Sequence, residues 1–407
     1  MHDLKRNEPQ TEMLDKLEPA KAVESDLQAK IQALLDYCQR DDWSGYDPYD
    51  GLNSRIFQAT PLRKSAFARL ALIQFIKRCP LNLRGLIGVP KTKNAKGIAL
   101  FASSAIKLEK FGLVEPELGR DLAEELIDLR SPGHDTMCWG YPFDWQNRHF
   151  MLPKYDPNII CSTFGGNALL DAFDRYGDQR FLEAATSVAD FIRTELNRTI
   201  DGDTFCFSYT PHDQGQVHNA NLLGAAYLSR VWQHTGEEGL REEAIAAAKY
   251  TIKRQREDGS WVYGESPKQG WIDSFHTGYN LLAIRQLDQA FDLPCLTDSL
   301  EAGFHYYLDH FFEPGGVVKY YNEDRYPLDS HAIAHAMVAL SELSDLDPKA
   351  LGLARQVFDW SSAEMRADEG YYYFQKKRFF TNRIPYIRWT QAWMLIGLSS
   401  LAEAEGS

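Results

Sequence analysis

Cysteine is scarce in this sequence: it makes up 6 of 407 residues, with no C-x-x-C pair and no cysteine beside a histidine. That pattern argues against a zinc ribbon, a dithiol redox motif and a disulfide-stapled fold. In a chain of this size the cysteines are expected to be buried free thiols. We therefore predict no metal site and no cofactor.

Long apolar runs and a surplus of basic residues are absent too. No stretch approaches the roughly 18 apolar residues of a membrane-spanning helix, and the N-terminus lacks the apolar segment of a signal peptide. With 44 Lys+Arg against 57 Asp+Glu, the net charge is −13, which disfavours binding to nucleic acid or to anionic membranes. The expectation is a cytoplasmic protein with no nucleic-acid partner and no transmembrane segment.

An internal repeat is the most informative feature that is present. Five segments share a polar or aromatic approach followed by a small-residue, leucine-rich helix. Equivalent positions are Leu169, Leu222, Leu281, Met337 and Met394, in steps of 53, 59, 56 and 57 residues. A sixth copy begins near Lys96. A period of this length indicates an architecture built from stacked repeats.

Each repeat contains two further elements. Charged amphipathic helices, such as residues 178–198, lie between the leucine-rich ones and have apolar residues at helical spacing. Aromatic residues alternate at i and i+2 in segments such as 203–209 and 369–375, which is typical of short strands. One buried and one half-exposed helix per repeat predict an all-α (α/α)6 toroid of six helical hairpins with short aromatic β-like inserts. Residues 1–20 are expected to form a polar N-terminal tail and residues 21–407 one toroid domain; an open α-solenoid is the alternative.

Candidate catalytic residues lie where inner helices begin. In a toroid these N-termini converge, and their free N–H groups and positive dipole ends favour an anionic ligand. Two of the helices start alike, with Asp273 before His276 and Asp329 before His331. The aspartates are either helix N-caps or reactive carboxylates. The histidines, together with Tyr279, are candidate general acids or bases.

Aromatic and basic residues near the same ends are candidates for substrate binding. Rings around a concave site can stack on sugar faces, and arginines can hold a carboxylate. The predicted binding residues are Trp139, Tyr141, Trp145, Arg148, Tyr209, His218, Trp261, Tyr320, His335, Arg388 and Trp389. The alternative for each ring is packing between repeats, and for each arginine a surface ion pair. His331 and His335 share a helix face, as metal ligands do, but no glutamate completes an H-E-x-x-H motif.

Four segments carry a family resemblance: residues 138–148, 157–173, 273–282 and 385–394. They resemble the VpsJ-like family of exopolysaccharide-cluster proteins, over a span from about residue 45 to the end. That family is similar to the helical domains of glucuronyl C5-epimerases and, more distantly, to N-acylglucosamine 2-epimerases. The resemblance implies an (α/α)6 fold, a setting in polysaccharide biosynthesis and association with polysaccharide assembly enzymes. It implies no settled reaction, although the paired histidines of sugar 2-epimerases have counterparts in His276 and either His331 or His335.

These observations favour a carbohydrate-active enzyme with a saccharide ligand. The predicted reaction is proton abstraction, of the epimerase or lyase type, on an acidic or acylated sugar. A glycoside hydrolase with Asp273 and Asp329 as its carboxylate pair is one alternative, and a non-catalytic glycan-binding protein is another. Residues 255–261 resemble the Q-x-x-D-G-S-W motif of triterpene cyclases, but in one repeat only, so an isoprenoid cyclase or prenyltransferase-like enzyme is a further alternative.

Overall fold

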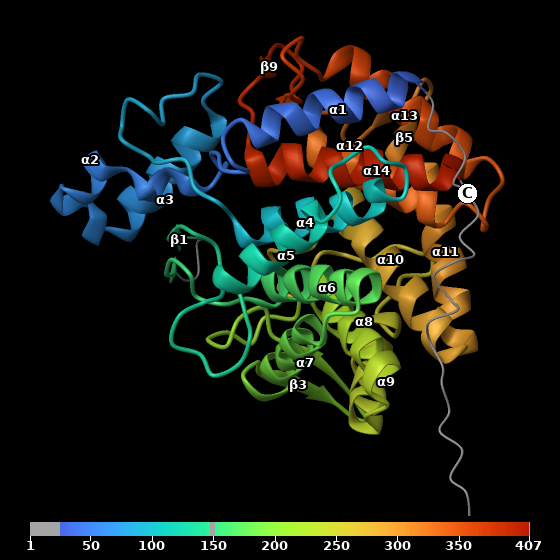
Figure 1. Cartoon of the computed structure of the whole chain (residues 1–407). Coiled ribbons are helices and arrows are strands. Elements are labelled where there is room, and N and C mark those ends of the chain that lie inside the picture. Colours follow the sequence, from blue (N-terminus) through green and yellow to red (C-terminus); the bar gives the residue numbers. More distant parts are fainter. Residues whose placement is uncertain (1–24, 147–150, 407) are drawn as a thin grey trace, which may run out of the picture.

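Two kinds of helix alternate along the computed structural model, which describes residues 25–146 and 151–406 (Figure 1). The inner helices are α4 (Ala95–Glu109), α6 (Ile159–Tyr176), α8 (His218–Thr235), α10 (Ser274–Phe291), α12 (Ser330–Glu342) and α14 (Trp393–Gly406). The outer helices are α1 (Ser25–Gln39), α5 (Leu118–Asp128), α7 (Gln179–Thr194), α9 (Glu238–Ile252), α11 (Pro294–Phe311) and α13 (Ala350–Glu364). The inner helices are buried on most sides because they carry mainly small and apolar residues.

The ring closes between the ends of the chain. Each inner helix packs against its inner neighbours, and α14 completes the circle by packing on α4. The first helix, α1, lies along α14 and serves as its outer partner (Figure 1). This closed arrangement confirms the predicted (α/α)6 toroid and excludes the open solenoid. The predicted tail, residues 1–20, lies outside the described residues.

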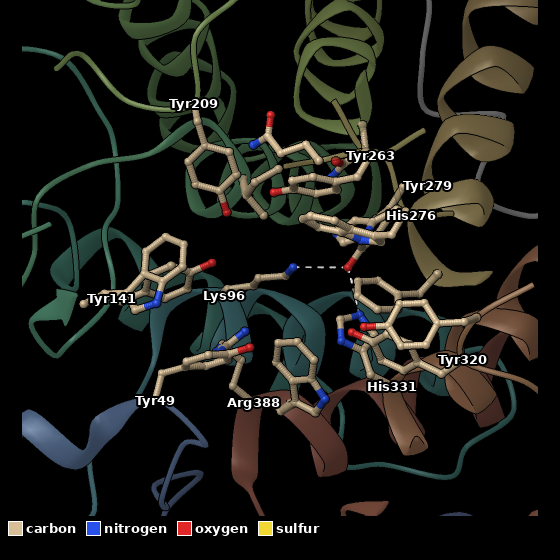
Figure 2. A pocket seen from close by; sticks show the side chains of 18 of the residues that line it. Tyr49, Lys96, Tyr141, Tyr209, Tyr263, His276, Tyr279, Tyr320, His331 and Arg388 are labelled. Carbon is tan, nitrogen blue, oxygen red and sulfur yellow. Dashed lines mark hydrogen bonds between the residues drawn. The ribbon is translucent and has the colours of Figure 1, made fainter. Parts of the chain in front are cut away.

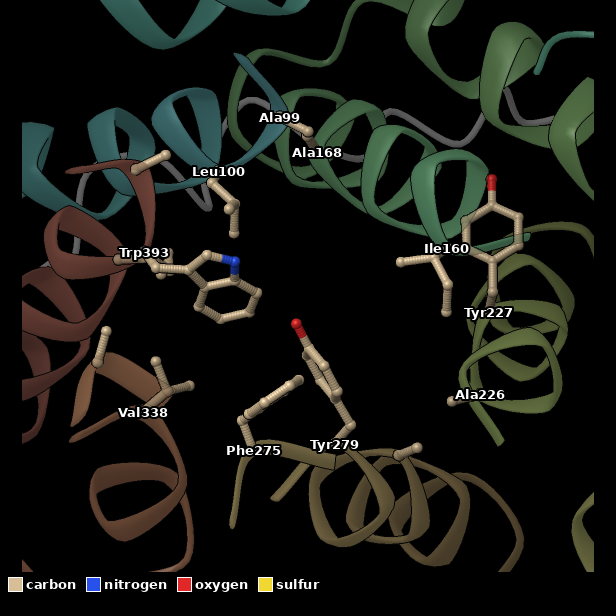
Figure 3. Close-up of a cluster of buried hydrophobic side chains, with 14 of the residues drawn as sticks. Ala99, Leu100, Ile160, Ala168, Ala226, Tyr227, Phe275, Tyr279, Val338 and Trp393 are labelled. Atoms are coloured by element: carbon tan, nitrogen blue, oxygen red, sulfur yellow. The ribbon is translucent and has the colours of Figure 1, made fainter. Parts of the chain in front are cut away.

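Apolar side chains from the inner helices meet inside the ring, as Figure 3 shows for Leu100, Phe275 and Trp393. Glycines let bulky rings approach the helices closely. A Cβ atom at Gly165 would lie 2.6 Å from the Trp139 ring, so only glycine leaves room for that indole. No described helix is both long and apolar enough to cross a bilayer.

Short antiparallel pairings hold the aromatic inserts. The strands are β1 (Trp145–Gln146), β2 (Met151–Leu152), β3 (Arg198–Asp201), β4 (Thr204–Phe207), β5 (Phe312–Glu313), β6 (Val317–Val318), β7 (Leu328–Asp329), β8 (Gln375–Lys376) and β9 (Thr381–Asn382). The first six form three hairpins in sequence order, and β7, β8 and β9 form one sheet in that order. Residues before three inner helices pair with the following insert: Val217 with Gly264, Asp273 with Tyr321, and Asp329 with Gln375. The inserts are thereby held at the N-termini of the inner helices.

An arm between α1 and α4 adds short helices beside the ring (Figure 1). They are η1 (Asp50–Asn53), α2 (Arg55–Gln58), η2 (Pro61–Lys64) and α3 (Ala66–Arg78). A buried ion pair between Arg84 Nε and Asp50 Oδ1, 2.6 Å long, ties the arm together. Ser65 separates η2 from α3 and caps α3, because its side chain accepts a hydrogen bond from the Ala68 N–H.

Candidate functional site

A cavity of about 490 Å³ lies where the inner-helix N-termini meet the inserts. Helices contribute Lys96, Ile160, Asn219, Phe275, His276, Tyr279 and His331, and the π-helical turn η3 (Ile387–Ala392) contributes Arg388 and Trp389. The inserts and the arm add Tyr49, Tyr141, Phe143, Trp145, Tyr209, Tyr263, Lys268, Gln269, Trp271, Tyr320 and Tyr321. Figure 2 shows phenols and bases from several of these elements pointing toward one another. We call this the central cavity.

The charged residue types that line the central cavity are basic, whereas the whole protein is acidic. Its described lining residues include Lys96, Lys268 and Arg388 but no aspartate or glutamate, although the chain carries a net charge of −13. Such a local field favours an anionic ligand. The surrounding rings provide flat apolar surfaces of the kind that stack on sugar faces.

Lys96 is a buried amine with no carboxylate partner among the described residues. It follows the N-cap Asn94 on α4 and is 3% exposed. Its Nζ atom lies 4.1 Å from the ring centroid of Phe164 and 5.3 Å from that of Trp393. Burial, aided by the nearby positive charge of Arg388, lowers the pKa of Lys96 to about 7. The amine is thus poised to gain or lose a proton near neutral pH.

A chain of hydrogen bonds links Lys96 to a histidine through a phenol (Figure 2). Lys96 Nζ lies 3.2 Å from Tyr279 Oη, which lies 2.9 Å from His331 Nε2. Because an ammonium group can only donate, Tyr279 accepts from Lys96 and donates to His331. Burial raises the pKa of Tyr279 well above its usual value and lowers that of His331, so the phenol stays protonated and the imidazole neutral.

Arg388 is oriented by a residue of the N-terminal arm. Its Nε and Nη2 atoms donate to the two carboxylate oxygens of Asp47, at 2.7 and 3.0 Å. This bidentate, buried pair raises the pKa of Arg388 above its usual value, chiefly through the Asp47 charge opposing the cost of burial. The guanidinium carbon lies 4.9 Å from the centroid of the Tyr141 ring. The arm therefore fixes a permanent positive charge in the cavity wall.

His276 is held in one orientation by its own helix cap. Asp273 accepts from the His276 backbone N–H, and its Oδ2 atom lies 2.7 Å from His276 Nδ1. The indole of Trp271 donates to the same oxygen at 3.0 Å. The Asp273 carboxylate keeps the proton of the imidazole on Nδ1, so Nε2 can accept a proton. His276 itself lines the central cavity. This is the arrangement required of a general base.

The second aspartate has a different role. Asp329 is fully buried, caps α12 by accepting from the His331 N–H, and accepts further bonds from Gln375 and from the Trp389 indole. Burial raises its pKa to about 6. Both aspartates are therefore N-caps, one of the two interpretations the sequence allowed, and neither lines the central cavity.

Nine of the predicted site residues line the central cavity together. They are His276, His331, Tyr279, Tyr141, Trp145, Tyr209, Tyr320, Arg388 and Trp389. His335 lies deeper, buried with its ring 4.5 Å from that of Tyr279. The structure brings these residues from separate repeats to one place, but their roles stay predictions.

Other predicted binding residues lie away from the cavity. Trp139 is buried and donates to the carbonyl of Leu126, and Trp261 is buried and donates to that of Thr251. Both rings fill space beside glycines of neighbouring helices. They therefore pack between repeats, which was the alternative to a role in binding. His218 is buried outside the cavity, with Nε2 2.9 Å from a carboxylate oxygen of Glu265. Arg148 lies outside the described residues.

Sequence reasoning missed Lys96, Tyr49, Lys268 and Trp271 as cavity residues. A signal for Lys96 was present, because it is a charged residue in the first turn of a helix that is otherwise small and apolar there. No comparable signal marks Tyr49, since its position depends on how the arm folds back on the ring. Among the described residues, no group of three or more histidine, cysteine or acidic side chains is arranged to hold a metal ion.

Solved structures similar to this chain are toroids. The match to cellobiose 2-epimerase from Bacillus thermoamylovorans has a TM-score of 0.64 at 12% identity and covers 94% of this chain and 100% of that chain. A possible member of the GH105 family from Salmonella enterica matches with a TM-score of 0.61 at 11% identity, covering 98% of both chains. A GH76 α-mannanase from Bacteroides thetaiotaomicron matches with a TM-score of 0.56 at 11% identity, covering 76% of this chain and 85% of that chain. At these identities the likeness establishes the fold. No family model and no curated protein matches the sequence.

Proposed function

We propose that the protein is an enzyme that acts on an acidic saccharide unit and moves a proton at a carbon next to a carboxylate or carbonyl group. The observation that carries this proposal is the composition of the central cavity. Its described lining holds three cationic side chains, oriented histidines and many phenols, but no carboxylate. Such a lining suits an anionic sugar whose reaction passes through an enolate.

In this proposal His276 is the base, and Tyr279 with Lys96 is the acid. His276 Nε2, with Nδ1 held by Asp273, takes the proton from the sugar carbon. The electron pair of that C–H bond passes to the neighbouring carboxylate or carbonyl, where Lys96 and Arg388 stabilise the negative charge. Tyr279 then returns a proton and is reprotonated by Lys96. Delivery of this proton to the opposite face of the carbon gives the epimer. In the elimination branch the C–O bond at the next carbon breaks instead, the oxygen leaves with the bonding electron pair and takes the Tyr279 proton, and the sugar becomes unsaturated.

A hydrolase is less well supported by the geometry. Glycoside hydrolysis generally needs two carboxyl groups flanking the scissile bond. Asp273 and Asp329 are each occupied by a helix N-terminus and an indole, and neither lines the cavity. The fold by itself does not separate these reactions, because it is shared by an epimerase and by glycoside hydrolases.

The biological setting follows from the family resemblance. The VpsJ-like segments support a place in surface polysaccharide biosynthesis or modification, and with it an association with assembly enzymes. The cytoplasmic location expected from the sequence stays a prediction. The sugar 2-epimerase similarity supports the same reaction class, since one of the matching toroids is a cellobiose 2-epimerase.

Solvent exchange tests the proposed function. The protein is incubated in D2O with uronic-acid mono- and oligosaccharides, and deuterium in sugar C–H positions is followed by NMR. We expect exchange with the intact protein, and a large loss with Lys96→Met. For the histidine variants described in the Discussion, the matched control is His234→Gln. This residue lies at the C-terminal end of α8, outside the central cavity. Cleavage without exchange and without an unsaturated product would favour hydrolysis, and binding without any of these reactions would favour a glycan-binding protein.

A further inference from the structure

A second cavity, of about 450 Å³, adjoins the central cavity on the side of the arm. It lies between α3 and β1, and its lining includes Gln74, Lys77 and Arg78. Tyr49 and Trp145 line both cavities, so the two spaces meet at these rings. The rings stand nearly at right angles, with centroids 6.2 Å apart and planes inclined by 72°. We call this second space the α3 groove.

The α3 groove carries unneutralised positive charge. Lys77 Nζ donates to the Tyr49 hydroxyl at 2.6 Å and lies 4.3 Å from the centre of that ring. Neither Lys77 nor Arg78 forms an ion pair with a described carboxylate, and the groove's described lining contains no aspartate or glutamate. The nearby Lys377 has its pKa lowered by burial and then by the charges of Arg78 and Lys77. An acidic protein thus has two adjoining cationic cavities.

We propose that the α3 groove is a second subsite for an anionic sugar unit, so that the ligand is an acidic oligosaccharide and not a monosaccharide. One unit occupies the central cavity, and the next crosses the Tyr49–Trp145 corner and presents its carboxylate to Lys77 and Arg78. Rings at the corner offer stacking surfaces, and the two cations supply charge-assisted hydrogen bonds. This inference rests on the proposed function in taking the ligand to be an acidic saccharide, but it concerns binding and not the reaction.

The chain offers a matched control for the test. Lys77→Gln/Arg78→Gln removes the two cations of the groove. Arg63→Gln/Lys64→Gln removes two adjacent cations of the same arm that line neither cavity. Both pairs change the net charge equally. All four side chains lie on the arm; Lys77 is half-buried and the other three are exposed, so melting temperatures are expected to stay near that of the parent protein.

Binding is measured by titration calorimetry with glucuronic and galacturonic acid, with their homo-oligomers of two to four units, and with neutral cello-oligosaccharides. The parent protein should bind the best acidic oligomer about tenfold or more tighter than its monomer, the gain expected of one or two charge-assisted contacts. The groove variant should lose most of this gain and keep its monomer affinity, and the control variant should keep both.

Equal affinity for monomer and oligomer in the parent protein would overturn the subsite, as would a groove variant that binds like the control. Binding of none of the acidic oligomers would overturn it as well. Length-dependent binding that is lost in the groove variant, without any deuterium exchange or unsaturated product, would instead support the subsite and refute the proposed reaction.

Discussion

At the N-terminus of α10, Asp273 caps the helix and also holds the imidazole of His276, whereas at the N-terminus of α12, Asp329 caps the helix and leaves the imidazole of His331 to Tyr279. Each aspartate also accepts a hydrogen bond from an indole, at 3.0 and 3.1 Å. The two sites therefore share a capping device but present their histidines differently.

The difference comes from one residue of spacing. His276 is the third residue after its cap and His331 the second. Because each helical residue turns the direction of the side chain by about 100°, the third residue returns over the capping carboxylate while the second points elsewhere. His276 keeps a side-chain exposure of 21%, and His331 is stacked between Phe275 and Trp393, 2% exposed. Similar sequence thus yields an imidazole oriented by its capping aspartate at one site and a buried neutral imidazole at the other.

The largest expected effect is a loss of activity without a loss of stability when His276, at the N-terminus of α10, is replaced. His276→Gln should reduce deuterium exchange about 100-fold or more, the lower end of general acid–base contributions, because it removes the free acceptor in the cavity. Its melting temperature should stay within a few degrees. Exchange rate per folded molecule is the measurement, with His234→Gln as control. Unchanged exchange would make His276 a structural residue.

The reverse pattern is expected at α12. His331→Ala should lower the free energy of unfolding by about 3 kcal/mol, in the range for truncating a buried side chain, because the ring lies between two aromatic partners. His276→Ala, with its partly exposed ring, should cost less than about 1 kcal/mol. Urea denaturation of both variants checks the contrast. Equal losses would mean that the spacing difference has no energetic consequence.

Lys96, which is linked to His331 of α12 through Tyr279, should make the stability of the protein depend on pH. Its pKa is lowered in the folded protein to about 7 from an unfolded value near 10.4, so the unfolded chain binds the extra proton between these values. Stability should therefore rise with pH in this window, by about 2 kcal/mol between pH 7 and 9 relative to Lys96→Met. Denaturation of both proteins across this range tests it. A parallel pH dependence of the two would show that Lys96 is not neutralised on folding.

Titration of the Lys96 amine should also make the activity depend on pH. If Lys96 must be protonated to reprotonate Tyr279, kcat/KM for exchange should fall as pH rises through about 7. The measurement is the exchange rate across this range for the parent protein. Tyr279→Phe should weaken the reaction and flatten this limb, because the link between Lys96 and the sugar is removed. A rate that rises through pH 7 would instead assign Lys96 as a base.

The smallest effect compares the two indoles. Trp389→Phe should destabilise the protein by about 1 to 2 kcal/mol, since it removes a donor from the buried carboxylate of Asp329. Trp271→Phe should cost less than about 0.5 kcal/mol, because that indole is 38% exposed and water can replace it at Asp273. Thermal unfolding of the two variants under one set of conditions measures the difference.

Much of the architecture is readable from local pattern. The repeat of small-residue helices located all six inner helices, and Asp273 and Asp329 are the N-caps that the sequence allowed. Burial of the inner helices follows from composition, because Lys96–Leu108 and Ser330–Ser341 have almost no polar face. The site's place at the inner-helix N-termini follows from the topology of the ring.

Sequence alone determined the repeat, the two helix classes and the end of the inner helices at which polar and aromatic residues gather, since each depends on periodicity within a repeat. Closure of the ring was decided by the packing of α14 on α4. Tertiary structure alone decided which side chains face the cavity. Trp139 and Trp261 turn into the core because glycines of neighbouring helices leave notches for their rings. Lys96 meets Tyr279, 183 residues later, only when the ring is closed. Asp47 orients Arg388 across 341 residues. Such contacts are absent from any local pattern, because the energy of burying a charge depends on neighbours that the fold brings from elsewhere.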